Sequence, residues 1–422
     1  MAGGSGARGG PLDGVRVADF SRVLAGPYAT MMLADFGADV IKIESSGGDD
    51  TRSWTPPVDA DGASTYFASV NRNKRSIVLD LATESGVAEA RRLAASADVV
   101  VENFRPGVMR RFGLDHEAVH AVNPTAVYCS ITGFGAGAGA ALPGYDLLVQ
   151  AVGGLMSVTG ASDGDPSKVG VALVDVLTGL NAFSGILLAL RDRDATGVGG
   201  HLEVDLLSSL LSALVNQASG VLATGVSPQR MGNAHPSIAP YESFRAADRD
   251  LVIAVGNDRQ FRSLAVVLDG VAGAPLGDDP RFATNPLRVA HRAELRAVIE
   301  ERLAVAPAAD WVESLTAAGV PAGLVNTVGE AISFAESLGL APVGALPTAS
   351  GAIGRFIANP IHLHGSEAGY RSAPPRLGEH AGADWLAAAR PRPTSPIRPP
   401  VRPPTDHDHD HDPASADTEG IA

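Results

Sequence analysis

The chain of 422 residues carries a formal net charge of −14, with 47 acidic residues against 33 lysines and arginines. Its length favours two domains over one small core. The acidic balance argues against a nucleic-acid partner, because phosphate binding needs a basic face. The single cysteine, Cys129, excludes an intramolecular disulfide, so we expect a cytoplasmic protein.

Nearly all basic residues are arginine, and Ala and Gly are abundant, which is typical of a GC-rich bacterial genome. Residues 1–10 are Gly-rich and lack the apolar segment of a signal peptide, so we expect a disordered N-terminus. The longest apolar stretches, residues 175–190 and 206–222, are interrupted by polar side chains. They predict buried helices, and we expect no membrane association.

The first ordered unit predicts a strand, a helix and a second strand. Strands are expected over Val15–Phe20 and Asp39–Glu44, and the helix over Tyr28–Phe36. Pro27 suits the first turn of that helix, and Gly37 suits its end. A βαβ unit of this kind predicts parallel strands with a right-handed crossover.

The alternation of strands and helices continues through the first half of the chain. It predicts strands at Ser76–Asp80, Asp98–Glu102 and Ala126–Ile131 and a helix at Glu84–Ala95. The fold class that follows is α/β, with a Rossmann-like, doubly wound large domain. The turn after the first strand lacks the G-x-G-x-x-G fingerprint, which weakens a dinucleotide interpretation.

The pattern changes near Gly225. Before it, two long helices are expected over Val176–Arg191 and Leu206–Thr224, with the strand His201–Asp205 between them. After it, the expected elements are a strand at Leu251–Val255 and helices at Arg259–Leu268, His291–Ala304 and Ala309–Ala317. This second group predicts a smaller α+β domain.

The predicted boundaries place the first part of the large domain at residues 11–225, the small domain at 226–330 and a return to the large domain at 331–390. Residues 391–422 are rich in Pro, then in Asp and His, and predict a disordered tail. His407, His409 and His411 alternate with Asp there. A solvated tail is favoured over a weak metal site, because no rigid element fixes the ligands, and no other metal site is expected.

Asp175 is the residue whose position first indicates chemistry. It follows the apolar run Val169–Val174 and precedes a predicted helix. An Asp at that point ordinarily caps the helix. A helix N-terminus also stabilises the ionised carboxylate, which is the form a nucleophile needs. The residues alone leave both interpretations open.

The segment Tyr145–Leu180 resembles the class III, or CaiB–BaiF, CoA-transferases. Further segments agree in family order: Pro11–Val15, Asp19–Ser21, Ala25–Pro27, Gly37–Glu44, Asn73–Ile77, Val101–Gly107 and Leu377–His380. The resemblance covers nearly all of residues 11–386. It implies that CoA moves between two carboxylic acids through an acyl anhydride and an aspartyl-CoA thioester on Asp175. It also implies coenzyme A and acyl-CoA as substrates, no prosthetic group, and an interlocked homodimer.

Two rival functions are weighed within this resemblance. The 2-methylacyl-CoA racemases of the family carry a His where this chain has Tyr145, followed by Asp146. Tyrosine, with a pKa near ~10, is a poor base at neutral pH, so the racemase alternative is less favoured. A non-catalytic CoA-binding or scaffold protein is disfavoured by the intact Asp175.

The resemblance assigns further residues to the site. The run Gly232–Tyr241 is similar to that of dicarboxylyl-CoA transferases and implies a carboxylate pocket. The turn after the first strand and the Asn103–Phe104 turn are expected to contact CoA, although the family's Gln is Leu24 here and its frequent basic residue is Ser45. The expected site residues are, for catalysis, Asp175, Tyr145, Asp146, Gly256 and Asn257; for CoA, Leu24, Ala25, Asn103, Phe104 and Arg111; and for the acid substrate, His235 and Ser237.

Overall fold

A six-stranded parallel sheet forms the centre of the computed structural model, which describes residues 10–270 and 275–387. The strands are β1 Arg16–Asp19, β2 Asp39–Glu44, β3 Lys74–Val78, β4 Val99–Glu102, β5 Val127–Thr132 and β6 His201–Asp205. Their order is β3-β2-β1-β4-β5-β6, which confirms the predicted doubly wound α/β fold. The order reverses between β1 and β4, and ligands of such sheets bind at the carboxyl ends of those two strands.

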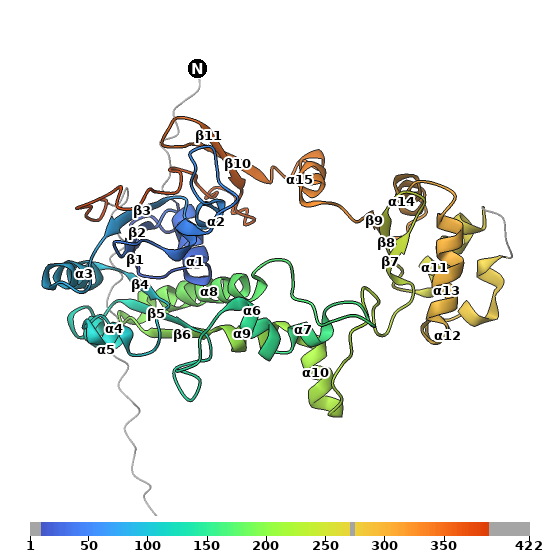
Figure 1. The fold of residues 1–422 in the computed structure, drawn as a ribbon, viewed down its shortest axis with the longest axis horizontal. Helices are drawn as coiled ribbons and strands as arrows, with labels where there is room; N and C mark the ends of the chain where they lie inside the picture. The colour runs from blue at the N-terminus through green and yellow to red at the C-terminus, as the bar shows by residue number, and fades with distance from the viewer. Residues whose placement is uncertain (1–9, 271–274, 388–422) are drawn as a thin grey trace, which may run out of the picture.

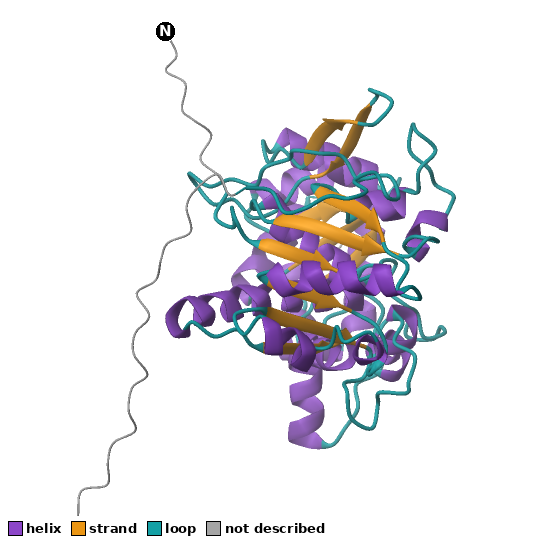
Figure 2. Cartoon of the chain, turned by 90° about the vertical axis from the view of Figure 1, so that its left-hand side faces the viewer, coloured by secondary structure: helices purple, strands orange, loops and turns teal. Residues whose placement is uncertain are grey.

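Helices cover both faces of this sheet (Figures 1 and 2). Neighbouring residues of β1 illustrate why, because Val17 belongs to the core on one face and Ala18 to the core on the other. One face packs against α1 Ala25–Asp35, α8 Leu173–Thr196 and α9 Leu206–Ala213, and the other against α3 Glu84–Ser96, α4 Val108–Arg111 and α5 His116–Val122.

Helix α8 explains the apolar stretch that the sequence places after Asp175. Among the described residues, α8 is long and apolar enough to cross a membrane, as is the bent pair of α9 and α10 Val215–Thr224 if the two are taken together. In the structure α8 packs against α1, β5 and β6, and its Ala182 and Ile186 are fully buried in the core. Packing in the protein core therefore accounts for the buried part of its composition.

The predicted helix Leu206–Thr224 is wrong in one respect, because it is two helices. Helix α9 ends at Ala213, and α10 Val215–Thr224 leaves at 82° to it. Val215 has a φ of 41°, in the left-handed region, which breaks the helix. Helix α10 has no buried residue, and Leu222 is 89% exposed.

A second unit follows and has its own apolar core. It contains an antiparallel sheet of β7 Tyr241–Arg245, β8 Asp250–Ala254 and β9 Ala322–Leu324, with helices α11 Asp258–Asp269, α12 Asn285–Ala290, α13 Arg292–Leu303 and α14 Ala308–Ala317. Figure 1 shows it at the far end of the molecule from the parallel sheet. The domain boundaries themselves stay a prediction, and the tail predicted at 391–422 lies outside the described residues.

After this unit the chain returns to the parallel sheet through α15 Val328–Ser337 and the hairpin β10 Val343–Pro347 and β11 Ile353–Ile357 (Figure 1). The returning segment is hydrogen-bonded to Asp35, whose side chain is fully buried. Arg72 donates to both carboxylate oxygens at 3.0 and 2.6 Å, and Asn359 donates at 3.1 Å. The Gly369 amide donates to the Asp35 carbonyl at 2.7 Å. The returning segment is thus bonded directly to the end of α1.

Candidate active site

An open cleft lies at the carboxyl ends of β1 and β4, where the strand order reverses. Its walls are the turn after β1, the turn after β4, the Gly-rich loop after β5 and the start of α8. The cleft brings together six residues expected from the sequence: Leu24, Ala25, Asn103, Phe104, Tyr145 and Asp175. These residues come from four separate segments of the chain, so the fold alone makes them neighbours.

Asp175 lies inside the first turn of α8, not ahead of it as predicted, because the helix begins at Leu173. The preceding apolar run is also less buried than expected, with Val171 61% exposed. One turn after Asp175, a Cβ on Gly179 would stand 2.7 Å from the Ala25 carbonyl oxygen. Residues i and i+4 share a helix face, so Asp175 stands directly beside the N-terminus of α1.

The cap of α8 is Asp146, the first residue of α6 Asp146–Val152. Its carboxylate accepts hydrogen bonds from the amides of Val174 and Asp175 at 2.8 and 3.3 Å. The other oxygen accepts from the Gln150 side chain at 2.7 Å. The capping role considered for Asp175 therefore belongs to a residue 29 positions earlier, which leaves the Asp175 carboxylate available to the cleft.

Burial raises the pKa of Asp175 to about 7, and the negative charge of Asp146 adds to the rise. This direction is opposite to the lowering expected from a helix N-terminus. The helix amides are already occupied by Asp146, so the helix end does not compensate the desolvation of Asp175. Asp175 consequently exchanges its proton near neutral pH, as groups at reactive sites often do.

Tyr66 does not line the cleft but lies within electrostatic range of its carboxylates, and the sequence analysis missed it. It lies in the short helix α2 Thr65–Ser69, with its ring edge-to-face against Trp54 at 4.9 Å between centroids. Burial raises the pKa of Tyr66 to about 12, and the charges of Asp175 and Asp146 contribute. Its hydroxyl thus stays protonated near the two carboxylates. Its only sequence signal was an aromatic pair shortly before the Asn73–Ile77 motif.

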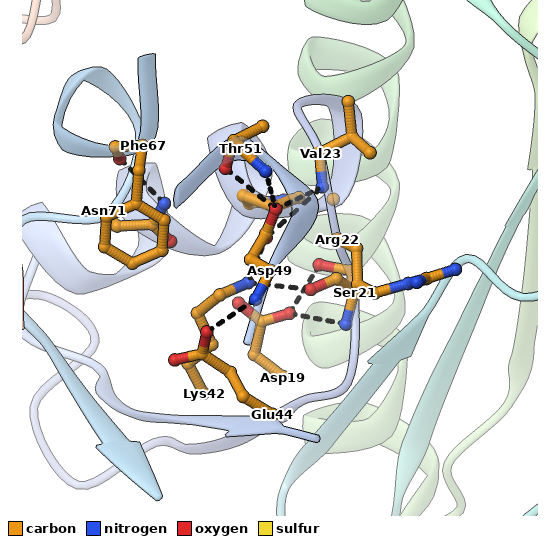
Figure 3. Close-up of polar contacts among 12 residues, drawn as sticks. Asp19, Ser21, Arg22, Val23, Lys42, Glu44, Asp49, Thr51, Phe67 and Asn71 are labelled. Atoms are coloured by element: carbon orange, nitrogen blue, oxygen red, sulfur yellow. Dashed lines mark hydrogen bonds and ion pairs between the residues drawn. The ribbon is translucent and has the colours of Figure 1, made fainter. Parts of the chain in front are cut away.

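Several side chains hold the turn after β1, some of which are drawn in Figure 3. The Asn103 amide pairs with both backbone groups of Arg22, accepting from its N–H at 2.8 Å and donating to its carbonyl at 2.7 Å. Asp19 accepts from the Ser21 amide at 3.0 Å, and Asp49 accepts from the Val23 amide. Asn103 therefore positions the cleft wall, in addition to lying where CoA contacts were expected.

Besides Asp146, which caps α8 and does not line the cleft, five expected residues lie outside the cleft of the single chain. Arg111 is exposed at the end of α4. Asn257 caps α11 by accepting from the Gln260 backbone amide at 3.0 Å, and the Gly256 backbone amide donates to the side-chain oxygen of Gln260. His235 and Ser237 precede β7 in the second unit. Their roles stay a prediction. In the described part of the chain, no cluster of three or more metal-binding side chains is present.

Comparison with known proteins identifies the family to which the chain belongs. Residues 12–381 match the model of CoA-transferase family III. The chain belongs to that family and is a CoA-transferase. It is 43% identical over 377 residues to the succinate–glutarate CoA-transferase of Agrobacterium fabrum, covering 88% of this chain and 94% of that protein.

Two further comparisons agree. The succinyl-CoA:glutarate CoA-transferase of Mus musculus is 44% identical over 330 residues, which cover 78% of this chain and 75% of the mouse protein. A CaiB/BaiF family protein from Brucella suis has a crystal structure that superposes with a TM-score of 0.80 at 44% identity. The match covers 88% of this chain and 98% of that chain.

Proposed function

We propose that this enzyme moves CoA from an acyl-CoA of the succinyl type to a dicarboxylic acid, with Asp175 as the covalent nucleophile. The observation that carries the proposal is the position of the Asp175 carboxylate, in the cleft beside the N-terminus of α1. The named activities of the Agrobacterium and mouse relatives, on succinate and glutarate, support the substrate class.

The proposed reaction has four balanced steps. Ionised Asp175 attacks the thioester carbonyl, the C–S bond breaks, and an acyl–aspartyl anhydride and CoA thiolate form. The thiolate attacks the aspartyl carbonyl and releases the donor carboxylate, leaving aspartyl-CoA. The acceptor carboxylate then attacks aspartyl-CoA and expels the thiolate. Finally the thiolate attacks the acceptor acyl group and frees the Asp175 carboxylate, with no net proton gained or lost.

Each attack forms an oxyanion, and the amides of Leu24 and Ala25 are suited to bind it. Within the described residues no acceptor takes either amide, and both residues line the cleft. Amides already fixed in place stabilise developing charge without reorganising. The racemase alternative lacks its histidine base here, because no histidine is found among the described residues of the cleft wall.

The dicarboxylate preference is tested at His235. The Ser237 amide donates to His235 Nδ1 at 3.1 Å, so the neutral ring carries its proton on Nε2 and can donate it to a second carboxylate. We expect His235→Ala to lower kcat/KM for succinate as acceptor by about tenfold or more while leaving butyrate nearly unchanged. His291→Ala, a partly exposed histidine of the same unit, is the matched control. Wild-type preference for butyrate, or equal losses on both acids, would count against a dicarboxylate.

The same proposal needs a second copy of the chain. His235 and Gly256 belong to the second unit, which stands away from the parallel sheet of its own chain (Figure 1). Large apolar side chains of α8, α10 and α15 are exposed, among them Leu188, Leu222 and Phe334. We infer an interlocked homodimer in which the second unit of each chain covers the cleft of the other. Burial of such apolar surface is typical of obligate dimers.

Mixed dimers test this arrangement. An Asp175→Asn subunit paired with a His235→Ala subunit should recover one intact site of two, because the intact Asp175 and the intact His235 then meet across the interface. Light scattering should give twice 43.2 kDa for the wild type. If the mixed dimer transfers CoA to succinate no faster than the two parent variants, both residues act within one chain and the interlocked arrangement is wrong.

A further inference from the structure

Val23, in the wall of the cleft, has a backbone conformation that its own side chain disfavours. Val23 has a φ of 67°, in the left-handed region where a Cβ meets the following carbonyl. Branching at Cβ makes Val one of the least suited residues for this region, and the chain places no glycine there. Such a conformation persists only where neighbouring groups impose it, and it is common at functional sites.

The Asp49 carboxylate contacts this residue directly (Figure 3). Both of its oxygens lie 3.3 Å from the Val23 amide nitrogen. Asp49 is itself fixed by an ion pair with Lys42 at 2.9 Å, and both side chains are completely buried. Lys42 Nζ also donates to the Ser21 carbonyl at 2.8 Å, so one buried pair holds the turn at two points.

The two backbone amides proposed to bind the oxyanion come directly after Val23 in the chain. Leu24 and Ala25 are the last residue of the turn and the first of α1, and their N–H groups have no acceptor among the described residues. The Ala25 carbonyl lies against Gly179, so the same residue is pressed to α8 one turn beyond Asp175. Rotation of the Val23 backbone would redirect both amides, because they follow it in the chain.

We propose that Asp49, held by Lys42, is a positioning residue for CoA transfer: it keeps Val23 in the left-handed conformation and so keeps the Leu24 and Ala25 amides directed at the carbonyl reacting on Asp175. This inference rests on the proposed function. Stability alone does not explain the buried Lys42–Asp49 pair, since buried ion pairs are often no more stabilising than apolar residues of similar size. A positioning role would explain it.

A double-mutant cycle with glycine tests it. We expect Asp49→Asn to lower kcat by about tenfold or more, with a much smaller change in KM for acyl-CoA, because donors displaced from the oxyanion act on the reacting state. In a Val23→Gly background the same substitution should cost at most about threefold, since glycine adopts the left-handed region without help. Val23→Ala is the matched control, because it shortens the side chain and keeps the backbone preference; it should restore nothing.

The outcomes separate this inference from the proposed function. A wild-type enzyme that transfers no CoA contradicts the proposed function. A wild type that transfers CoA, with the same kcat loss from Asp49→Asn in the Val, Ala and Gly backgrounds, overturns the positioning role. If Asp49→Asn does not fold, Asp49→Glu, which keeps the charge and shifts the carboxylate, enters the same cycle. Hydrogen–deuterium exchange of the peptide covering residues 20–28 gives a readout without turnover: exchange should rise in Asp49→Asn, and unchanged exchange overturns the proposal.

Discussion

An Asp175→Asn enzyme is expected to transfer no CoA and yet to resist unfolding better than the wild type above pH 7. The amide cannot form the anhydride, so turnover should fall to the level of the assay background. Burial and the charge of Asp146 raise the pKa of Asp175 to about 7, from 3.8 in an unfolded chain. The folded wild type therefore binds more protons than the unfolded chain between about pH 4 and pH 7, and its free energy of unfolding falls as pH rises through that window.

Asparagine has almost the same shape as aspartate and does not titrate, so the free energy of unfolding of the variant does not fall with pH for this reason. Urea unfolding of both proteins from pH 4 to pH 8 measures the difference. It should be small near pH 4, grow up to about pH 7 and then level off. Burial raises the pKa of Glu102 to about 7 as well, but Glu102 is present in both proteins and cancels in the difference. Parallel curves across the range would contradict a raised pKa at Asp175.

Isotope transfer distinguishes covalent catalysis from direct exchange in the wild type. An acceptor acid labelled with ¹⁸O on its carboxylate should leave one labelled oxygen on Asp175, because the bridging oxygen of the second anhydride stays with the aspartate. The peptide that contains Asp175, recovered after turnover, should carry that label in its mass spectrum. Direct attack of the acceptor on acyl-CoA would label the released donor acid but leave Asp175 unlabelled, so an unlabelled Asp175 after many turnovers would exclude the anhydride route.

Asp35→Asn is expected to lower the free energy of unfolding by about 3–5 kcal/mol, because it leaves the buried Arg72 guanidinium without its counter-charge. The new amide group must also face a donor, since Arg72 and Asn359 both donate to the carboxylate. Urea unfolding followed by circular dichroism checks the magnitude.

Glu89→Gln is the control for the Asp35 substitution. Glu89 pairs with Arg92 at 2.8 Å, but both side chains are more than a third exposed, and such pairs contribute about 0–1 kcal/mol. Equal losses from the two substitutions would show that the bonds between Asp35 and the returning segment do not stabilise the fold.

Local patterns were enough to locate most of the parallel sheet. The bounds predicted for β2 and β6 coincide with those observed, because each apolar run ends at a clear turn or charge. The start of β3 was predicted two residues late, at Ser76 instead of Lys74. Lys74 in fact lies buried in the sheet, 3.1 Å from Asp19, a partner 55 positions earlier. No local pattern contains that pairing.

The candidate site was predicted in the same uneven way. Asp175 and Tyr145 were found from the family motif, and the structure places both in the cleft. The hydrogen bonds around them were not predicted. Asp146 accepts from the Val174 amide and Asp49 from the Val23 amide, and each bond joins segments that are distant in the chain. The break between α9 and α10, before Val215, was not predicted either, because no glycine or proline marks it in the sequence.

The bond from Asn359 to Asp35 spans 324 positions, which orders events during synthesis. At about 5–20 residues per second, roughly 15–65 s separate the appearance of the two residues on the ribosome. The whole second unit is made within that interval, before the segment that covers the end of α1 exists. The parallel sheet is therefore the first part of the protein to begin folding and the last to be completed.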